Sequence, residues 1–139
     1  MSWSAAQRYT SERRAAGDAR RFCSRHIADI LGTGPAAATV AADAEVIVSE
    51  LVTNSIEAGS TRVDVRLALR RDHLLLTVAD DAPGRPQRRT PLPTDARGRG
   101  LAIIAALARA WGTAPSGAGK EVWAHLAVLP ELTADLDYT

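Results

Sequence analysis

Glu50 and Asn54 are the first residues in the chain whose types and spacing indicate chemistry. They stand four positions apart in the segment Glu50-Leu-Val-Thr-Asn54, so on a helix they lie one turn apart on the same edge of an apolar stripe. A carboxylate and a carboxamide there can supply hard oxygen atoms to Mg²⁺ or its waters. The carboxylate can also act as a general base. For such a pair taken alone, a structural role at the surface is the more frequent explanation.

Asp80 is the second candidate, because it directly follows an apolar run and opens the segment Asp80-Asp-Ala-Pro-Gly84. An acid before proline and glycine commonly forms a turn. Alternatively, the carboxylate can accept a hydrogen bond from the amino group of a bound base, which contributes about 1.5–3 kcal/mol. Such an acceptor selects adenine over guanine, since the guanine carbonyl would face the acid.

A third candidate is the segment Arg97-Gly98-Arg99-Gly100-Leu101, which opens an apolar helix. Free N–H groups and the positive dipole end of a helix favour phosphate, and glycines let the backbone approach the anion closely. The alternative is a glycine-rich linker that starts a helix. The segment is not a Walker A loop, and Ile103 stands where a Rossmann fingerprint requires its third glycine.

Two helices are expected to position the first candidate pair. Apolar residues recur at steps of three and four over residues 11–31 and 36–58, which predicts amphipathic helices, and Gly59 predicts the end of the second. Alternation over residues 63–69 and the apolar run 73–79 predict two neighbouring strands joined by a turn at residues 70–72.

The second half of the chain is expected to continue with a long loop over residues 80–97 and a helix over residues 101–110. Two closing strands flank residues 117–119, the second at residues 121–129, and the tail 130–139 is expected to fray. The first ten residues carry a weak pattern for an edge strand. This order predicts an α+β, two-layer sandwich, with helices on one face of a mixed, largely antiparallel sheet.

The composition fits a single globular domain over residues 1–139. Of 139 residues, 46% are hydrophobic and 24% charged, and the net charge of +1 argues against a nucleic-acid binder. The single cysteine, Cys23, excludes an internal disulfide. No apolar run is long enough to span a membrane, and the first residues lack a signal-peptide core, so a soluble cytoplasmic protein with no membrane partner is expected.

Taken together, the order and separation of these motifs resemble the GHKL (histidine-kinase-like, Bergerat) ATP-binding fold. The details ELVTN, GRGLAII and KEVWAHL are most similar to the branch of anti-sigma-factor serine/threonine protein kinases. The resemblance spans about residues 15–129. It implies ATP and Mg²⁺ as ligands.

The resemblance implies a role for each candidate. Asn54 would coordinate the Mg²⁺ between the phosphates, and Glu50 would be the catalytic base that takes the proton from a substrate serine or threonine. Asp80 would hold the adenine amino group, and Gly84 would let the loop pass close to the nucleotide. Arg97, Gly98, Arg99, Gly100 and Leu101 would form the phosphate contacts, and residues 85–97 would form a lid.

Three positions depart from the family pattern. Ala82 replaces the first glycine of the acidic box, and its methyl group is expected to crowd the turn. Ala58 replaces a histidine that often follows the asparagine. Glu121 replaces a threonine before Val-Trp that supports adenine through water, and a carboxylate there is expected to alter the adenine site.

Two functions follow from the resemblance. One is a serine/threonine kinase that binds a sigma factor and phosphorylates an anti-sigma antagonist, a protein of the anti-anti-sigma type. The other is a non-catalytic, ATP-binding or nucleotide-independent module that holds a partner. The catalytic half of a sensor histidine kinase is disfavoured, because the chain is too short to include a dimerising hairpin with a phospho-acceptor histidine. A homodimer is expected from the family.

Overall fold

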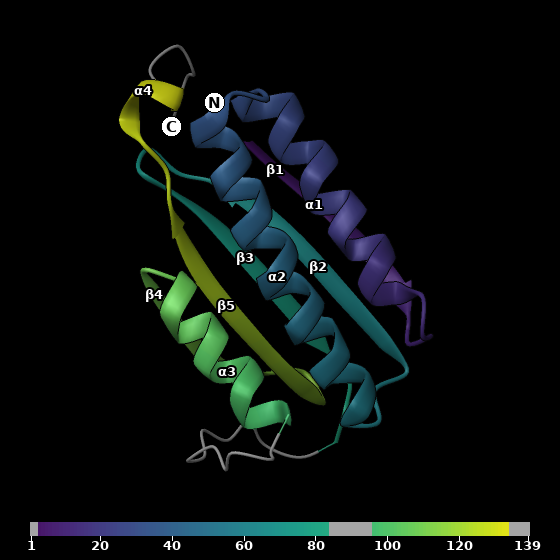
Figure 1. Cartoon of the computed structure of the whole chain (residues 1–139). Helices are drawn as coiled ribbons and strands as arrows, with labels where there is room; N and C mark the ends of the chain where they lie inside the picture. Colours follow the sequence, from purple (N-terminus) through teal and green to yellow (C-terminus); the bar gives the residue numbers. More distant parts are fainter. Residues whose placement is uncertain (1–2, 84–95, 134–139) are drawn as a thin grey trace.

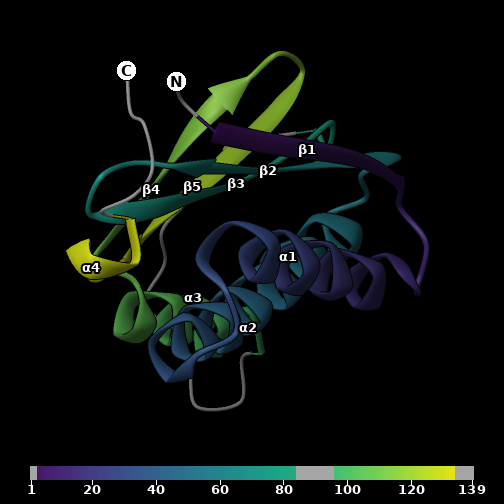
Figure 2. The ribbon, with the colours of Figure 1, turned by 90° about the horizontal axis from the view of Figure 1, so that it is seen from above.

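The computed structural model describes residues 3–83 and 96–133, and for residues 96–100 it describes the backbone alone. Five strands form one sheet in the order β1-β2-β3-β5-β4, and every neighbouring pair is antiparallel. Helices α1, α2 and α3 all cover the same face of this sheet (Figure 1, Figure 2). The elements are β1 Trp3–Thr10, α1 Ala15–Leu31, α2 Pro35–Glu57, β2 Arg62–Leu69, β3 His73–Asp80, α3 Ala96–Leu107, β4 Ala110–Ser116, β5 Gly119–Ala127 and α4 Pro130–Thr133.

The expected two-layer α+β sandwich is therefore confirmed, and its described pairings are antiparallel throughout rather than mixed. Side chains alternate across a strand, and β3 follows this rule closely. Leu74, Leu76 and Val78 are buried toward the helices, as is Asp80 at the end of the strand. The intervening residues of β3 lie on the other face, which no described helix covers (Figure 2).

Helix α2 is the central helix of the layer and contacts both α1 and α3. Its buried positions recur at helical spacing and include Ala44, Ile47, Val48 and Leu51, which pack against the sheet. Pro35 fits the first turn of this helix, where its missing N–H is not needed. Gly59 has φ +92°, a conformation that favours glycine, and it ends the helix as the sequence indicates.

Several predicted boundaries differ from the structure. Helix α1 begins at Ala15 rather than at residue 11, because residues 11–14 form a turn in which Glu12 accepts the Ala15 N–H. Helix α3 begins at Ala96 and ends at Leu107, earlier at both ends than the predicted range of residues 101–110. Part of the expected frayed tail, Pro130–Thr133, is the short helix α4, in which the buried Thr133 hydroxyl donates to the Arg71 carbonyl. Within the described residues, no helix has the length and apolarity required to cross a membrane.

Candidate functional site

The candidate site is built around the carboxylate of Asp80, the last residue of β3. Its side chain is only 1% exposed and points to the helical face of the sheet. One carboxylate oxygen, Oδ1, accepts the backbone N–H of Ala82 at 3.0 Å. The other, Oδ2, accepts a hydrogen bond from the ammonium group of Lys120 at 2.7 Å. A buried carboxylate requires partners of this kind, because an unpaired charge would be costly in this environment.

Lys120 reaches Asp80 because the two residues are directly paired across β3 and β5. Directly opposed residues project their side chains to the same face of a sheet. The Lys120 side chain is 19% exposed, so it retains some access to solvent while it covers Asp80. Strand register thus places a donor beside the acceptor.

Gly119, the first residue of β5, allows this close approach. A Cβ added at Gly119 would lie 1.9 Å from the Asp80 carbonyl oxygen and 2.7 Å from the Asp81 Cα. No side chain fits in that space, so a glycine is required where the two strands meet beside the carboxylate.

The neighbouring Asp81 has a different set of partners. Its carboxylate accepts the backbone N–H groups of Thr61 at 2.7 Å and Arg62 at 3.1 Å, and it also bonds the Thr61 hydroxyl. These hydrogen bonds, with that of the Thr61 hydroxyl the largest cause, lower the pKa of Asp81 to about 2. Asp81 therefore fastens the end of β3 to the start of β2, whereas Asp80 faces the helical layer.

Ala82 does not crowd the turn, and that expectation was wrong. Its φ is not positive, so a Cβ causes no strain there, and the residue is buried with 2% of its surface exposed. The backbone N–H of Ala82 donates a hydrogen bond to the Asp80 carboxylate. The alanine instead adds a buried methyl group beside the carboxylate.

Glu50 and Asn54 lie on the flank of α2 that faces away from α1. The opposite flank holds Ser49, whose hydroxyl accepts a hydrogen bond from Arg20 of α1 at 2.9 Å. Successive helical residues differ by about 100°, so Glu50 and Asn54 fall on the side toward α3. Both are half-buried, as predicted for residues at the edge of the apolar stripe.

The segment Arg97–Gly100 lies inside the first turns of α3 rather than before the helix. The sequence placed the helix start at Leu101, whereas it lies at Ala96, so the free N–H groups of the first turn include that of Gly98 but not that of Gly100. Leu101 is half-buried and packs against the core. Gly84 and most of the expected lid, residues 85–95, fall outside the described residues.

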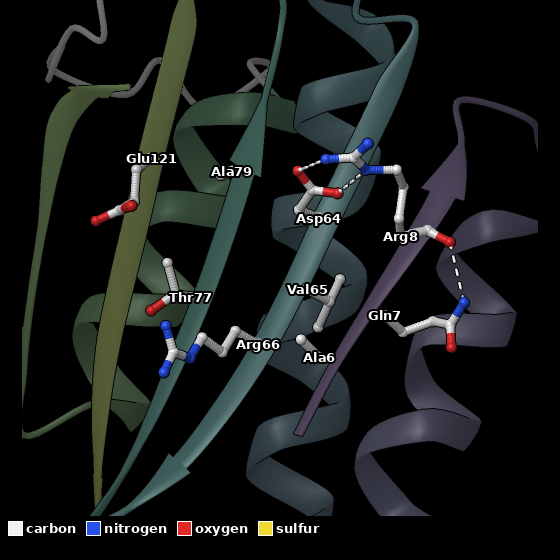
Figure 3. A pocket seen from close by; sticks show the side chains of 9 residues that line it. All are labelled: Ala6, Gln7, Arg8, Asp64, Val65, Arg66, Thr77, Ala79 and Glu121. Carbon is white, nitrogen blue, oxygen red and sulfur yellow. Dashed lines mark hydrogen bonds and ion pairs between the residues drawn. The ribbon is translucent and has the colours of Figure 1, made fainter. Parts of the chain in front are cut away.

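Glu121 lies on the face of the sheet opposite to Asp80 and Lys120, so the expected carboxylate beside the adenine site was misplaced. It follows Lys120 on β5, and neighbouring residues of a strand point to opposite faces. Glu121 lines a shallow pocket of ≈ 390 Å³ with Thr77, Arg66 and the Arg8–Asp64 ion pair (Figure 3). The residue of β5 that lies beside Asp80 on the helical face is Lys120.

No role at the site was predicted from the sequence for Lys120 or Gly119, since residues 117–119 were treated as the link between two closing strands. The signal was available in the strand period. Counting back in steps of two from the apolar residues Val122 and Ala124 puts Lys120 on the helical face. Lys120 is also the only lysine in the sequence, among 17 lysine and arginine residues.

The chemical types of these residues suit the parts of a purine nucleotide. The buried Asp80 carboxylate offers an acceptor for a base, and the flank of α2 toward α3 carries oxygen ligands suited to Mg²⁺. The start of α3, with two glycines in its first turns, offers backbone N–H groups to an anion. These groups come from three different elements, one strand of the sheet and two helices of the layer that covers it.

The fold is an α+β sandwich with a buried carboxylate at the end of β3, and the comparisons assign its family. The histidine kinase-like ATPase domain family matches residues 9–126, so the chain belongs to that family. A solved structure, the histidine kinase domain from the Erythrobacter litoralis EL346 blue-light activated histidine kinase, has the same fold with TM-score 0.50 and 20% identity. The match covers 86% of this chain and 65% of that one. No match was found among curated proteins.

Proposed function

We propose that this chain is an ATP-binding regulator that acts as a serine/threonine protein kinase of the anti-sigma-factor type. The observation that carries the proposal is the buried carboxylate of Asp80, which ends β3 and faces the helical layer that presents Glu50 and Asn54. Membership in the histidine kinase-like ATPase domain family supports nucleotide binding at this place. The ELVTN segment supports the kinase branch.

Nucleotide binding divides among three elements in this proposal. Asp80 accepts the exocyclic amino group of the base, and Asn54 supplies an oxygen ligand to Mg²⁺. Gly84 and the residues from Arg97 to Leu101 complete the contacts to the nucleotide. ATP supplies the phosphoryl group, and Mg²⁺ neutralises its charge.

Glu50 acts as the general base in the transfer step. Its carboxylate accepts the proton of a substrate serine or threonine hydroxyl while the hydroxyl oxygen bonds to the γ-phosphorus. The bond between that phosphorus and the bridging oxygen of ADP breaks, and the oxygen retains the electron pair. Phosphoryl transfer depends mainly on positioning and charge neutralisation. The protein therefore needs to supply only one base and one metal ligand for the transfer step.

The partners in this proposal are proteins. The chain binds a sigma factor, and its substrate is a protein of the anti-anti-sigma type, within a cytoplasmic circuit. We also propose that it works as a homodimer. Neither nucleic acid nor membrane takes part.

A second function, a non-catalytic partner-binding module, is favoured by one specific observation. The carboxylate that would read the base is already engaged by Lys120 at 2.7 Å. If the Lys120 ammonium group keeps a base away from this carboxylate, Asp80 is only a structural residue, and the fold then serves only to bind a partner.

Calorimetric titration with Mg·ATP tests the nucleotide site. We expect the natural chain to bind, and Asp80→Asn and Asn54→Ala each to weaken binding at least about tenfold, the loss of one charge-assisted contact. Asp29→Asn, on the exposed surface of α1, is the matched control and should bind normally. Absence of binding at millimolar Mg·ATP would exclude the kinase function for this chain.

Transfer is tested separately with radiolabelled ATP and a purified anti-anti-sigma-type protein. Glu50→Gln should abolish labelling while Mg·ATP binding survives. Glu45→Gln is the control, because Glu45 lies on the same helix but on the flank toward α1. ATP binding without any transfer to such proteins would favour the non-catalytic module.

A further inference from the structure

Lys120 lies at the candidate site, and the proposed nucleotide binding makes no use of its ammonium group. Its ammonium group lies 2.7 Å from Asp80 Oδ2, on the helical face of the sheet. The carboxylate is 1% exposed and the lysine side chain 19% exposed. A base that approaches Asp80 therefore meets a hydrogen-bond donor together with the acceptor.

The position of this donor is well defined by the backbone. Direct pairing of Lys120 with Asp80 fixes the starting points of both side chains. Gly119 brings the two strands into closer contact than any other residue would permit. The ammonium group also has three donors, and toward the residues that the structure describes it uses one, for Oδ2, which leaves two for another acceptor.

The carboxylate likewise retains capacity. Two oxygens offer about four acceptor sites, and among the described residues the Ala82 N–H and Lys120 occupy one on each oxygen. Asp80 and Lys120 together thus form an acceptor next to a donor. The flexible stem of lysine lets the donor shift while the carboxylate stays in place.

Purines present complementary edges to such a pair. Adenine places a donor, the 6-amino group, beside the acceptor N1. Guanine and hypoxanthine place an acceptor, O6, beside the donor N1–H. A carboxylate alone rejects the 6-oxopurines, because O6 would face an acceptor. With a lysine beside it, the carboxylate can accept N1–H while the ammonium group donates to O6.

We propose that Lys120 is a base-selecting residue that widens the specificity of the site, so that the chain binds guanine and hypoxanthine nucleotides as well as ATP. This inference rests on the proposed nucleotide site at Asp80. It concerns the base alone and requires no phosphoryl transfer.

The test compares the dissociation constants of Mg·ATP, Mg·GTP and Mg·ITP by calorimetry. ITP isolates the 6-oxo group, because hypoxanthine lacks the 2-amino group of guanine. We expect the natural chain to bind all three within about tenfold of one another. In Lys120→Met, GTP and ITP should weaken by roughly 10- to 100-fold relative to ATP, the effect of one charged hydrogen bond.

Arg66→Met is the matched control, because it removes one positive charge from the opposite face of the sheet. It should leave the ratios among the three nucleotides unchanged. If Lys120→Met does not fold, Lys120→Arg keeps the charge and should retain GTP and ITP binding. The ratios among the three dissociation constants in the natural chain are measured without any variant, so this part of the test does not depend on folding of a mutant.

A spectroscopic readout is independent of affinity ratios. With ¹⁵N-labelled lysine, the chain's only lysine gives a single side-chain ammonium signal in NMR. ITP should shift this signal.

The inference is overturned if ATP binds but GTP and ITP bind at least about a thousandfold more weakly, or if Lys120→Met leaves the ratios unchanged. If none of the three nucleotides binds, the proposed function fails as well, so the two failures are distinguishable.

Discussion

Gly119 lies directly against the backbone of Asp80, with space for a hydrogen atom but not for a methyl group. The Cβ of any other residue would stand 1.9 Å from the Asp80 carbonyl oxygen and 2.6 Å from its carbonyl carbon. Both contacts are to backbone atoms, which cannot move without separating β3 from β5. The position of the site carboxylate therefore depends on a missing side chain in the adjacent strand.

Gly119→Ala is expected to destabilise the fold and displace Asp80. Forcing a methyl group against backbone should lower the free energy of unfolding by roughly 2–3 kcal/mol or more, at the upper end for overpacking. Mg·ATP binding should weaken in parallel. Urea denaturation gives the first quantity, and calorimetric titration gives the second.

Gly17→Ala provides the control for Gly119→Ala. Gly17 lies within α1, where an added Cβ would meet only the flexible arginine side chains of its own helix, the nearest atom at 3.4 Å. Because alanine is favoured over glycine inside a helix, this variant should gain about 0.5–1 kcal/mol. Equal stability of Gly119→Ala and the natural chain would contradict the steric argument.

The sequence was sufficient to predict the helices and strands with strong periodicity. The stripe of α2 and the alternation of β2 follow from burial against one layer, and both elements lie within one residue of the predicted bounds. Helix α3 was placed too late, because two glycines in its first turns have low helix propensity and resemble a linker. Tertiary packing against α2 and β4 outweighs that local preference.

The candidate site was predicted only in part, for a reason that concerns neighbours in space. Asp80 and Asp81 are chemically identical in the sequence, and only the structure shows that one meets Lys120 and the other Thr61. Lys120 is far from Asp80 along the chain, and pairing of β3 with β5 brings them together. Register between distant strands cannot be deduced from local patterns alone.

Asp81→Asn is expected to lower stability at neutral pH and to make that loss depend on acidity. Hydrogen bonds from Thr61 and Arg62 lower the pKa of Asp81 to about 2, below its ordinary value of 3.8. A depressed carboxyl pKa stabilises the fold above pH 4, and this contribution is lost as the pH falls toward 2. The difference in melting temperature between the two proteins should therefore be largest near pH 7 and narrow between pH 4 and 2. A constant difference over that range would exclude the linkage.

His125 is expected to make the fold less stable in mild acid. Burial is the main cause that lowers the pKa of His125. The stacked ring of His73, whose centroid lies 4.3 Å from that of His125, lowers it further, as do the guanidinium groups of Arg109 and Arg70. The carboxylate of Asp72 has the opposite effect. A histidine with a lowered folded pKa binds its proton more readily in the unfolded chain. The free energy of unfolding should thus decrease from pH 8 to pH 5.5, a range in which Asp81 remains ionised.

The variant His125→Gln isolates this effect of His125, because it removes the titrating ring from β5. Urea denaturation at pH 8 and pH 5.5 should show a smaller change in the variant than in the natural chain. An unchanged pH dependence would assign the effect to another group.

Cys23 is expected to report unfolding and nucleotide binding without any enzymatic assay. Its side chain is 0% exposed, and burial, with a smaller effect from Glu45, raises the pKa of the thiol to about 12. The thiolate is the reactive form, so three pKa units above the ordinary value of 9.0 reduce its population about a thousandfold. Iodoacetamide at pH 8 should therefore modify this single cysteine only when the chain unfolds, as mass spectrometry of timed samples can show.

A nucleotide that binds only the folded chain, at about 100 times its Kd, should slow labelling by roughly a further hundredfold when refolding is faster than alkylation. Rapid labelling of the folded chain would contradict the burial of Cys23, and labelling indifferent to ATP, GTP and ITP would contradict nucleotide binding itself.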